Sequence, residues 1–181
     1  MSLDTVVING FIGKLLMKKH KLLGAILLAP LVTLAVAGTA LATPSSGLTS
    51  STFSLGRFGE FHMKTNAEPD NQIELKTKGD SDVYVVSNTF VSGGTSGWHT
   101  HPGPSLITVK SGTITAYEGD DPTCTPHVYT AGEGFVDPGD GHVHLLRNEG
   151  SVDAVTVAVQ IIPAGAARRI DIVPAPGNCP F

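Results

Sequence analysis

Glycine and proline divide the second part of this chain into short segments, and their spacing limits the fold more than any other feature. Residues 43–181 contain 17 of the 21 glycines and 11 of the 12 prolines. No stretch of a dozen residues between them repeats apolar side chains at the three- and four-residue spacing of an amphipathic helix. Long helices are therefore excluded from this part of the chain.

Short segments rich in β-branched residues recur instead, each bounded by turn-forming residues. We expect strands over residues 72–78, 83–91, 106–110, 113–118, 127–130, 142–147, 154–162 and 169–173. One face of the segment at 154–162 carries four apolar side chains, those of Val155, Val157, Val159 and Ile161. Ser111-Gly112 predicts a tight hairpin between two strands. The pattern predicts an all-β sandwich or barrel.

Residues 17–42 have the layout of a secretory signal peptide. A basic run follows Met17, and 16 of the 21 residues from Leu22 to Ala42 are apolar, with no charge among them. We expect cleavage after Ala42, which leaves residues 1–16 as an extension without a structural role and Met1 or Met17 as the start. An uncleaved membrane anchor is the alternative, because 21 helical residues just span a hydrocarbon core of about 30 Å.

Removing this leader changes the charge of what remains. The whole chain has a net charge of −4, whereas residues 43–181 carry 8 Lys and Arg against 15 Asp and Glu. Such an acidic segment has no basic field to bind a polyanion, so nucleic acid is not an expected partner. We expect residues 43–54 to form a flexible or edge-strand lead-in to one secreted or otherwise extracytoplasmic domain at 55–181.

Both cysteines, Cys124 and Cys179, lie in this exported part. An oxidising compartment favours a disulfide between them. Closing a loop with 54 residues between the cysteines stabilises a fold by about 4 kcal/mol in the chain-entropy model. A reactive thiol pair is the alternative, although the spacing is not Cys-x-x-Cys.

Four histidines form two His-x-His pairs, His99 with His101 and His142 with His144. Residues i and i+2 of a strand point to the same face, so each pair can present two imidazoles to one side of a sheet. Neutral imidazoles from two strands make half of a transition-metal shell and leave positions for water or substrate. The two pairs together predict a metal site.

These pairs lie within two stretches that resemble the motifs of the cupin superfamily. Residues 93–112 are similar to the first motif, Gly-x5-His-x-His-x3–4-Glu-x6-Gly, and residues 132–148 to the second, Gly-x5-Pro-x-Gly-x2-His-x3-Asn. This chain has Ser105 at the glutamate position and one extra residue between Pro138 and Gly141. The resemblance implies a small single-domain cupin-type β-barrel, a jelly-roll-like double-stranded β-helix.

The resemblance also implies the ligands. It assigns metal binding to His99, His101 and His144, the last because the motif spacing is kept after the inserted residue. His142 and Ser105 are candidates for an additional ligand or a substrate contact. Asp137 is interpreted as a turn former or as an acceptor for a ligating imidazole.

Three-His sites among the cupins resemble those of thiol dioxygenases and of diketone- or gentisate-type dioxygenases, which use Fe(II). Imidazole ligands accept Zn, Mn, Ni or Cu as well as Fe, so the metal stays open. We expect an exported cupin that holds one divalent transition metal, binds a small molecule and acts as a dioxygenase-type oxidoreductase. The alternative is a non-catalytic module that binds a small molecule, a sugar or a metal. A homodimer is compatible with either, and membrane contact requires an uncleaved leader.

Overall fold

The computed structural model of the chain describes residues 44–65 and 71–181. The upstream extension, the signal peptide and the cleavage site predicted within residues 1–42 lie outside these ranges. No helix in the described ranges is long and apolar enough to cross a membrane.

The described residues form strands and turns, without an α-helix. In chain order the strands are β1 (Ser46–Phe58), β2 (His62–Lys64), β3 (Glu74–Lys76), β4 (Ser81–Thr95), β5 (His99–Thr100), β6 (Ser105–Ser111), β7 (Thr113–Glu118), β8 (His127–Thr130), β9 (Gly134–Asp137), β10 (His144–Arg147), β11 (Ala154–Pro163) and β12 (Ile170–Asp171). Each of the eight predicted strands overlaps one of these. Residues 43–54 were left open as flexible or edge strand, and the structure shows a strand from Ser46 onward.

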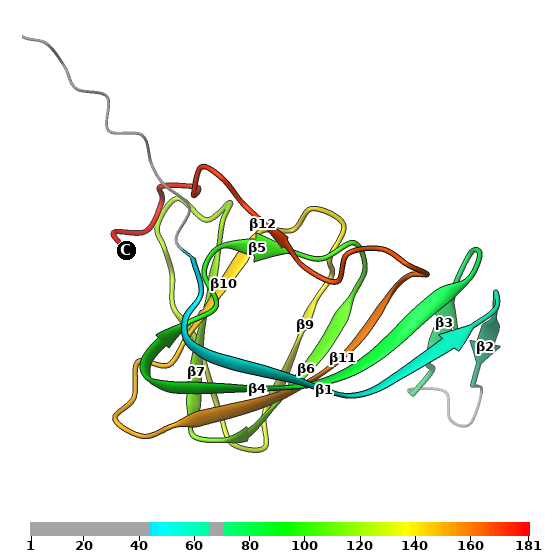
Figure 1. Cartoon of the computed structure of the whole chain (residues 1–181), viewed down its shortest axis with the longest axis horizontal. Helices are drawn as coiled ribbons and strands as arrows, with labels where there is room; N and C mark the ends of the chain where they lie inside the picture. The colour runs from blue at the N-terminus through cyan, green and yellow to red at the C-terminus, as the bar shows by residue number, and fades with distance from the viewer. Residues whose placement is uncertain (1–43, 66–70) are drawn as a thin grey trace, which may run out of the picture. The chain divides into compact units, whose positions relative to one another are not determined.

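Ten of these strands form one antiparallel sheet that curves into a nearly closed barrel (Figure 1). One wall consists of β1, β4, β11, β6 and β9 in that order, and the other of β12, β5, β10, β7 and β8. The walls join where Thr95 of β4 pairs with Arg147 of β10. Gly94 permits this crossing, because a Cβ there would lie 2.6 Å from the carbonyl oxygen of Gly47. β2 and β3 form a separate two-stranded sheet. The all-β, cupin-type barrel predicted from the sequence is confirmed.

The alternation along β11 decides which side chains face the barrel interior. The four apolar residues that share one face, Val155 to Ile161, point outward and are half-buried or exposed. The interior face carries Ala154, Thr156, Ala158, Gln160 and Ile162, which are all buried. Polar side chains therefore reach the interior from the middle of this strand.

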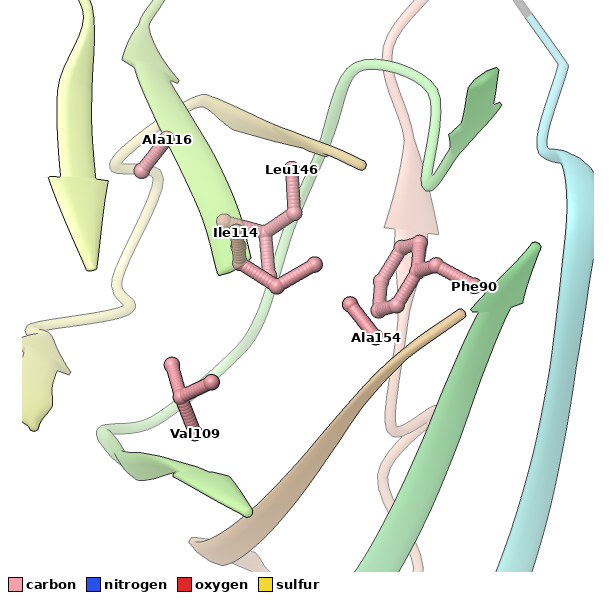
Figure 2. Close-up of a cluster of buried hydrophobic side chains, with 6 residues drawn as sticks. All are labelled: Phe90, Val109, Ile114, Ala116, Leu146 and Ala154. Atoms are coloured by element: carbon pink, nitrogen blue, oxygen red, sulfur yellow. The ribbon is translucent and has the colours of Figure 1, made fainter. Parts of the chain in front are cut away.

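Apolar side chains from both walls pack together inside the barrel, as Figure 2 shows. The cluster consists of Phe90, Val109, Ile114, Ala116, Leu146 and Ala154. Ala154 begins β11, and Gln160 lies six residues farther along the same strand. Apolar packing therefore fills the interior beside the start of β11, and polar residues occupy the interior beside its end.

The hairpin predicted at Ser111-Gly112 is wrong. β6 pairs with β11 and β9, whereas β7 pairs with β10 and β8, so the two strands belong to opposite walls. Gly112 has a φ of 74°, and a Cβ there would lie 2.8 Å from the Cα of Ala154. The glycine is needed because the chain changes walls in close contact with the start of β11.

Candidate metal centre

Three histidines meet inside the barrel, at the ends of two neighbouring strands. His99 belongs to β5 and pairs directly with His144 of β10, and His101 follows β5. Their ring centroids lie 4.3 to 5.4 Å apart, and each residue is at most 6% exposed. One ligand atom from each histidine lies within 4.8 Å of the others. The structure thus brings together the three residues predicted as ligands.

Backbone hydrogen bonds fix the orientation of two of these rings. His99 Nδ1 lies 2.8 Å from the carbonyl oxygen of Gly97, and His101 Nδ1 lies 2.6 Å from that of Arg168. A carbonyl oxygen only accepts, so Nδ1 carries the proton and donates in both rings. The Nε2 lone pair of a neutral imidazole is then left to bind a metal, and a carbonyl bond on the other nitrogen is the usual support of a histidine ligand.

The three imidazoles are held in their neutral form. Burial lowers the pKa of His99 well below its ordinary value, with His144 nearby acting in the same direction. Burial also lowers the pKa of His101, and it lowers that of His144 to about 4. Neutral imidazole is the form that ligates metal, so the donor set fits a divalent transition ion at neutral pH.

Ser105 and Gln160 face the histidines from the opposite wall. Ser105 is fully buried and accepts a 3.1 Å hydrogen bond from Gln160 Nε2. The other side-chain atom of this amide, Gln160 Oε1, accepts a 2.8 Å hydrogen bond from Arg168 Nη1. The sequence motifs did not point to Gln160, although its polar side chain on one face of the strand at 154–162 is a signal for it.

A cavity of about 290 Å³ lies beside the histidines. Its lining includes the three histidines, Ser105 and Gln160, and its apolar part includes Phe90, Ile107 and Leu146. Among the described residues that line it, the arginines Arg168 and Arg169 carry full charges and no carboxylate is present. No motif in the sequence pointed to these two arginines.

His142 lies outside the group of three. It is partly exposed, and its Nε2 lies 2.9 Å from Glu118 Oε2 while its Nδ1 lies 3.1 Å from Asp137 Oδ1. The inserted residue of the second motif lies in the turn before it, where Asp140 has a φ of 51°. His142 therefore bridges two carboxylates. Together with Asp137 and His144 it forms a second cluster of potential ligand atoms.

Cys124 and Cys179 form the predicted disulfide. Cys179 is 8% exposed and packs with Trp98, Tyr117 and Leu145. The bridge fixes the C-terminal segment against the barrel, and it is consistent with an oxidising, extracytoplasmic location.

Fold and site together define a small antiparallel β-barrel protein with a buried, histidine-lined interior site. The sequence matches the cupin domain family over residues 88–160, the segment that holds both histidine motifs. The segment 88–160 is thus similar to the cupin domain family, and the barrel that contains it has the cupin-type fold.

Solved structures with a similar arrangement include an oxalate oxidase, at 26% identity and a TM-score of 0.39, with 45% of this chain and 46% of that chain covered. The chain thus matches less than half the length of that enzyme. A protein from Klebsiella pneumoniae with a double-stranded β-helix domain is 26% identical, with a TM-score of 0.43 and 59% and 86% of the two chains covered. A cupin domain from Bordetella pertussis is 19% identical, with a TM-score of 0.39 and 57% and 93% covered. No curated protein matches the chain.

Proposed function

We propose that this cupin domain binds one divalent transition metal ion through the Nε2 atoms of His99, His101 and His144. The observation that carries the proposal is the convergence of three buried, neutral imidazoles, two of which already use their Nδ1 protons on backbone carbonyls. Buried polar atoms are normally satisfied, and a cation satisfies several lone pairs that converge on one point. Imidazole ligands accept Fe, Zn, Mn, Ni or Cu.

The positive charges that line the cavity favour an anionic small molecule as its ligand. Arg168 and Arg169 line the cavity, and Gln160 Oε1 holds Arg168 Nη1 at 2.8 Å. Arg169 already donates to the carbonyl oxygen of Ser96 and to Asp171, so Arg168 is the better placed of the two to bind a ligand. A planar guanidinium pairs with a carboxylate through two parallel hydrogen bonds, and a cavity of about 290 Å³ suits a small carboxylic acid.

We propose a dioxygenase-type oxidoreductase acting on such an acid. A divalent transition metal at the histidines would supply Lewis acidity and, when it is redox-active, the electrons that activate dioxygen. Arg168 binds the carboxylate of the substrate, and the Ser105–Gln160 hydrogen bond fixes the polar wall opposite the histidines.

A non-catalytic binding module for a small acid is the second candidate. One observation favours it: no carboxylate lines the described part of the cavity to act as a general base, and Ser105 stands where the cupin motif has a glutamate. In either case we propose a secreted protein, since the chain carries a signal-like leader and its domain holds a disulfide.

Metal analysis of the purified, exported protein tests the site. Protein produced with Fe, Zn, Mn, Ni and Cu supplied is expected to hold about one ion per chain. His101→Ala is expected to lose the ion, whereas His127→Ala, which removes an exposed histidine, keeps it. A metal content far below one ion per chain that His101→Ala leaves unchanged would contradict the proposal.

Ligand binding and oxygen uptake then separate the enzyme from the binding module. We expect the Fe(II)-loaded protein to bind small mono- and dicarboxylic acids better than their amides. Arg168→Gln should weaken this binding about 10- to 100-fold, and Lys110→Gln, an exposed control, should not. Binding without oxygen uptake from any acid favours the module, and equal affinity for acids and amides contradicts the anionic ligand.

A further inference from the structure

The carboxylate that the first cupin motif lacks in this chain is present on the neighbouring strand. Ser105, at the glutamate position, begins β6, and Asp137 ends β9. The two residues are direct partners in the antiparallel pairing of these strands. Both are buried, at 0% and 3% exposure, so both side chains face the barrel interior. Asp137 therefore brings a carboxylate next to the position that Ser105 leaves without one.

The two oxygens of Asp137 have different surroundings. Oδ1 accepts a 3.0 Å hydrogen bond from the backbone N–H of Gly139 and lies 3.1 Å from His142 Nδ1. Oδ2 is fully buried and has no hydrogen-bond partner among the described residues. A buried carboxylate oxygen without a donor costs several kcal/mol unless a cation satisfies it, so Oδ2 requires an explanation.

His101 does not provide a donor. Oδ2 lies 4.0 Å from His101 Nε2, which is too long for a hydrogen bond. His101 holds its proton on Nδ1, because that atom lies 2.6 Å from the carbonyl oxygen of Arg168. No hydrogen therefore lies between His101 Nε2 and the carboxylate oxygen, and Gln160 Nε2, which also donates to Ser105, lies 3.4 Å from that histidine nitrogen. Two atoms bound to one metal at about 2.0–2.2 Å lie about 3–4 Å apart, so a small movement of either side chain lets one ion hold both.

We propose that Asp137 Oδ2 is the fourth protein ligand of the metal, in place of the missing glutamate. The inference rests on the proposed three-His site and extends it to a three-His-one-carboxylate shell. One carboxylate beside three neutral imidazoles leaves a charge of +1 on a site that holds a divalent ion. The hydrogen bonds on Oδ1 hold the carboxyl group, and Oδ2 lies on the side of His101, 4.0 Å from its Nε2.

The competing role for Asp137 is that of a positioning residue. Its Oδ1 lies 3.5 Å from His144 Nδ1, a distance from which a small movement gives a hydrogen bond to that ring. Loss of such an outer partner typically costs 10- to 100-fold in metal affinity. Loss of a direct anionic ligand is expected to cost more metal affinity than this. The distance from Asp137 to the metal can also be measured directly.

The test compares Asp137→Asn with Asp140→Asn in the full, exported protein. Asp140 is exposed, lies three residues away and undergoes the same change in charge; Asn also tolerates its positive φ. Zn²⁺ affinity is measured by competition with a chelator. We expect Asp137→Asn to weaken Zn²⁺ binding more than about 100-fold relative to Asp140→Asn. Adding Ser105→Glu to Asp137→Asn should recover a large part of the loss, because it returns a carboxylate to the motif position.

A crystal structure of the Zn-loaded wild-type protein decides the question even if a variant fails to fold. Asp137 Oδ2 within about 2.3 Å of the zinc supports the inference. Zinc held by the three histidines with Oδ2 more than about 3 Å away overturns it and leaves the three-His site intact. Equal Zn²⁺ affinity of the two variants also overturns it. Absence of Zn²⁺ binding by the wild-type protein overturns the proposed function itself, and this inference with it.

Discussion

Breaking the disulfide between Cys124 and Cys179 is expected to affect both the stability of the barrel and its histidine site. The two cysteines are 55 residues apart in the sequence, and the bridge closes that loop. In the chain-entropy model a loop of this length contributes about 4 kcal/mol to the free energy of unfolding at 25 °C. The size of this effect follows from the loop length alone.

The effect on the site follows from the segment that the bridge anchors. β12 pairs with β5, and Asp171 is the direct partner of His99. The carbonyl oxygen of Arg168, just before β12, accepts the hydrogen bond that fixes His101. A C-terminal segment released at Cys179 holds both contacts less firmly. We therefore expect divalent metal to bind about tenfold more weakly, at the lower end of the cost of losing an outer partner of a ligand.

Urea unfolding of the wild-type protein and of the double variant Cys124→Ser/Cys179→Ser measures the first effect. With a slope of about 2 kcal/mol per molar urea, a loss of about 4 kcal/mol lowers the midpoint by about 2 M. Reductant should reproduce the shift in the wild-type protein and leave the double variant unchanged. A midpoint shift below about 0.5 M would refute the reasoning. Unchanged Zn²⁺ affinity would refute the link from the C-terminal segment to the site.

Two further predictions concern residues inside the barrel. The pKa of His144 is about 4 in the fold against an ordinary 6.5, so the unfolded chain takes up its proton first as the pH falls. The metal-free protein should therefore lose up to about 3 kcal/mol of stability between pH 6.5 and pH 4. The His144→Gln variant should lose less stability over the same pH range. Urea unfolding at several pH values measures both. Asn148 donates to the carbonyl oxygens of Phe90 and Val152 and accepts from the N–H of Gly150. Asn148→Ala removes one buried and two part-buried hydrogen bonds and should lower the free energy of unfolding by about 3 kcal/mol. A loss below about 1 kcal/mol would contradict this.

Local patterns in the sequence predicted an all-β fold and two His-x-His pairs, and the resemblance to the cupin motifs implied the barrel type and the choice of His99, His101 and His144. Alternation over residues 154–162 predicted the strand that became β11, and the spacing His99-x-His101 placed two imidazoles on one face. These features depend on residues close together in the chain. The alternation did not say which face of β11 points inward, because an interior with a polar site reverses the usual preference for the more apolar face.

Contacts between distant residues could not be predicted in this way. Arg168 reaches the cavity from the segment after β11, and its carbonyl oxygen orients His101 from 67 residues away. Asp137 was interpreted as a turn former or an outer partner, since its position before Pro138-Gly139 explains an aspartate on local grounds alone. Only the pairing of β6 with β9 places its carboxylate opposite Ser105.

The two departures from the cupin motifs both lie next to this one residue. Ser105 is the direct strand partner of Asp137. The inserted residue lengthens the turn after Pro138, in which the N–H of Gly139 donates to Asp137 Oδ1. The same turn leads to His142, whose Nδ1 faces the same oxygen. Residues of this turn thus occupy Oδ1, while Oδ2, 4.0 Å from His101 Nε2, has no hydrogen-bond partner among the described residues. A carboxylate held in this way suits the proposed site, where Ser105 stands in place of the motif glutamate.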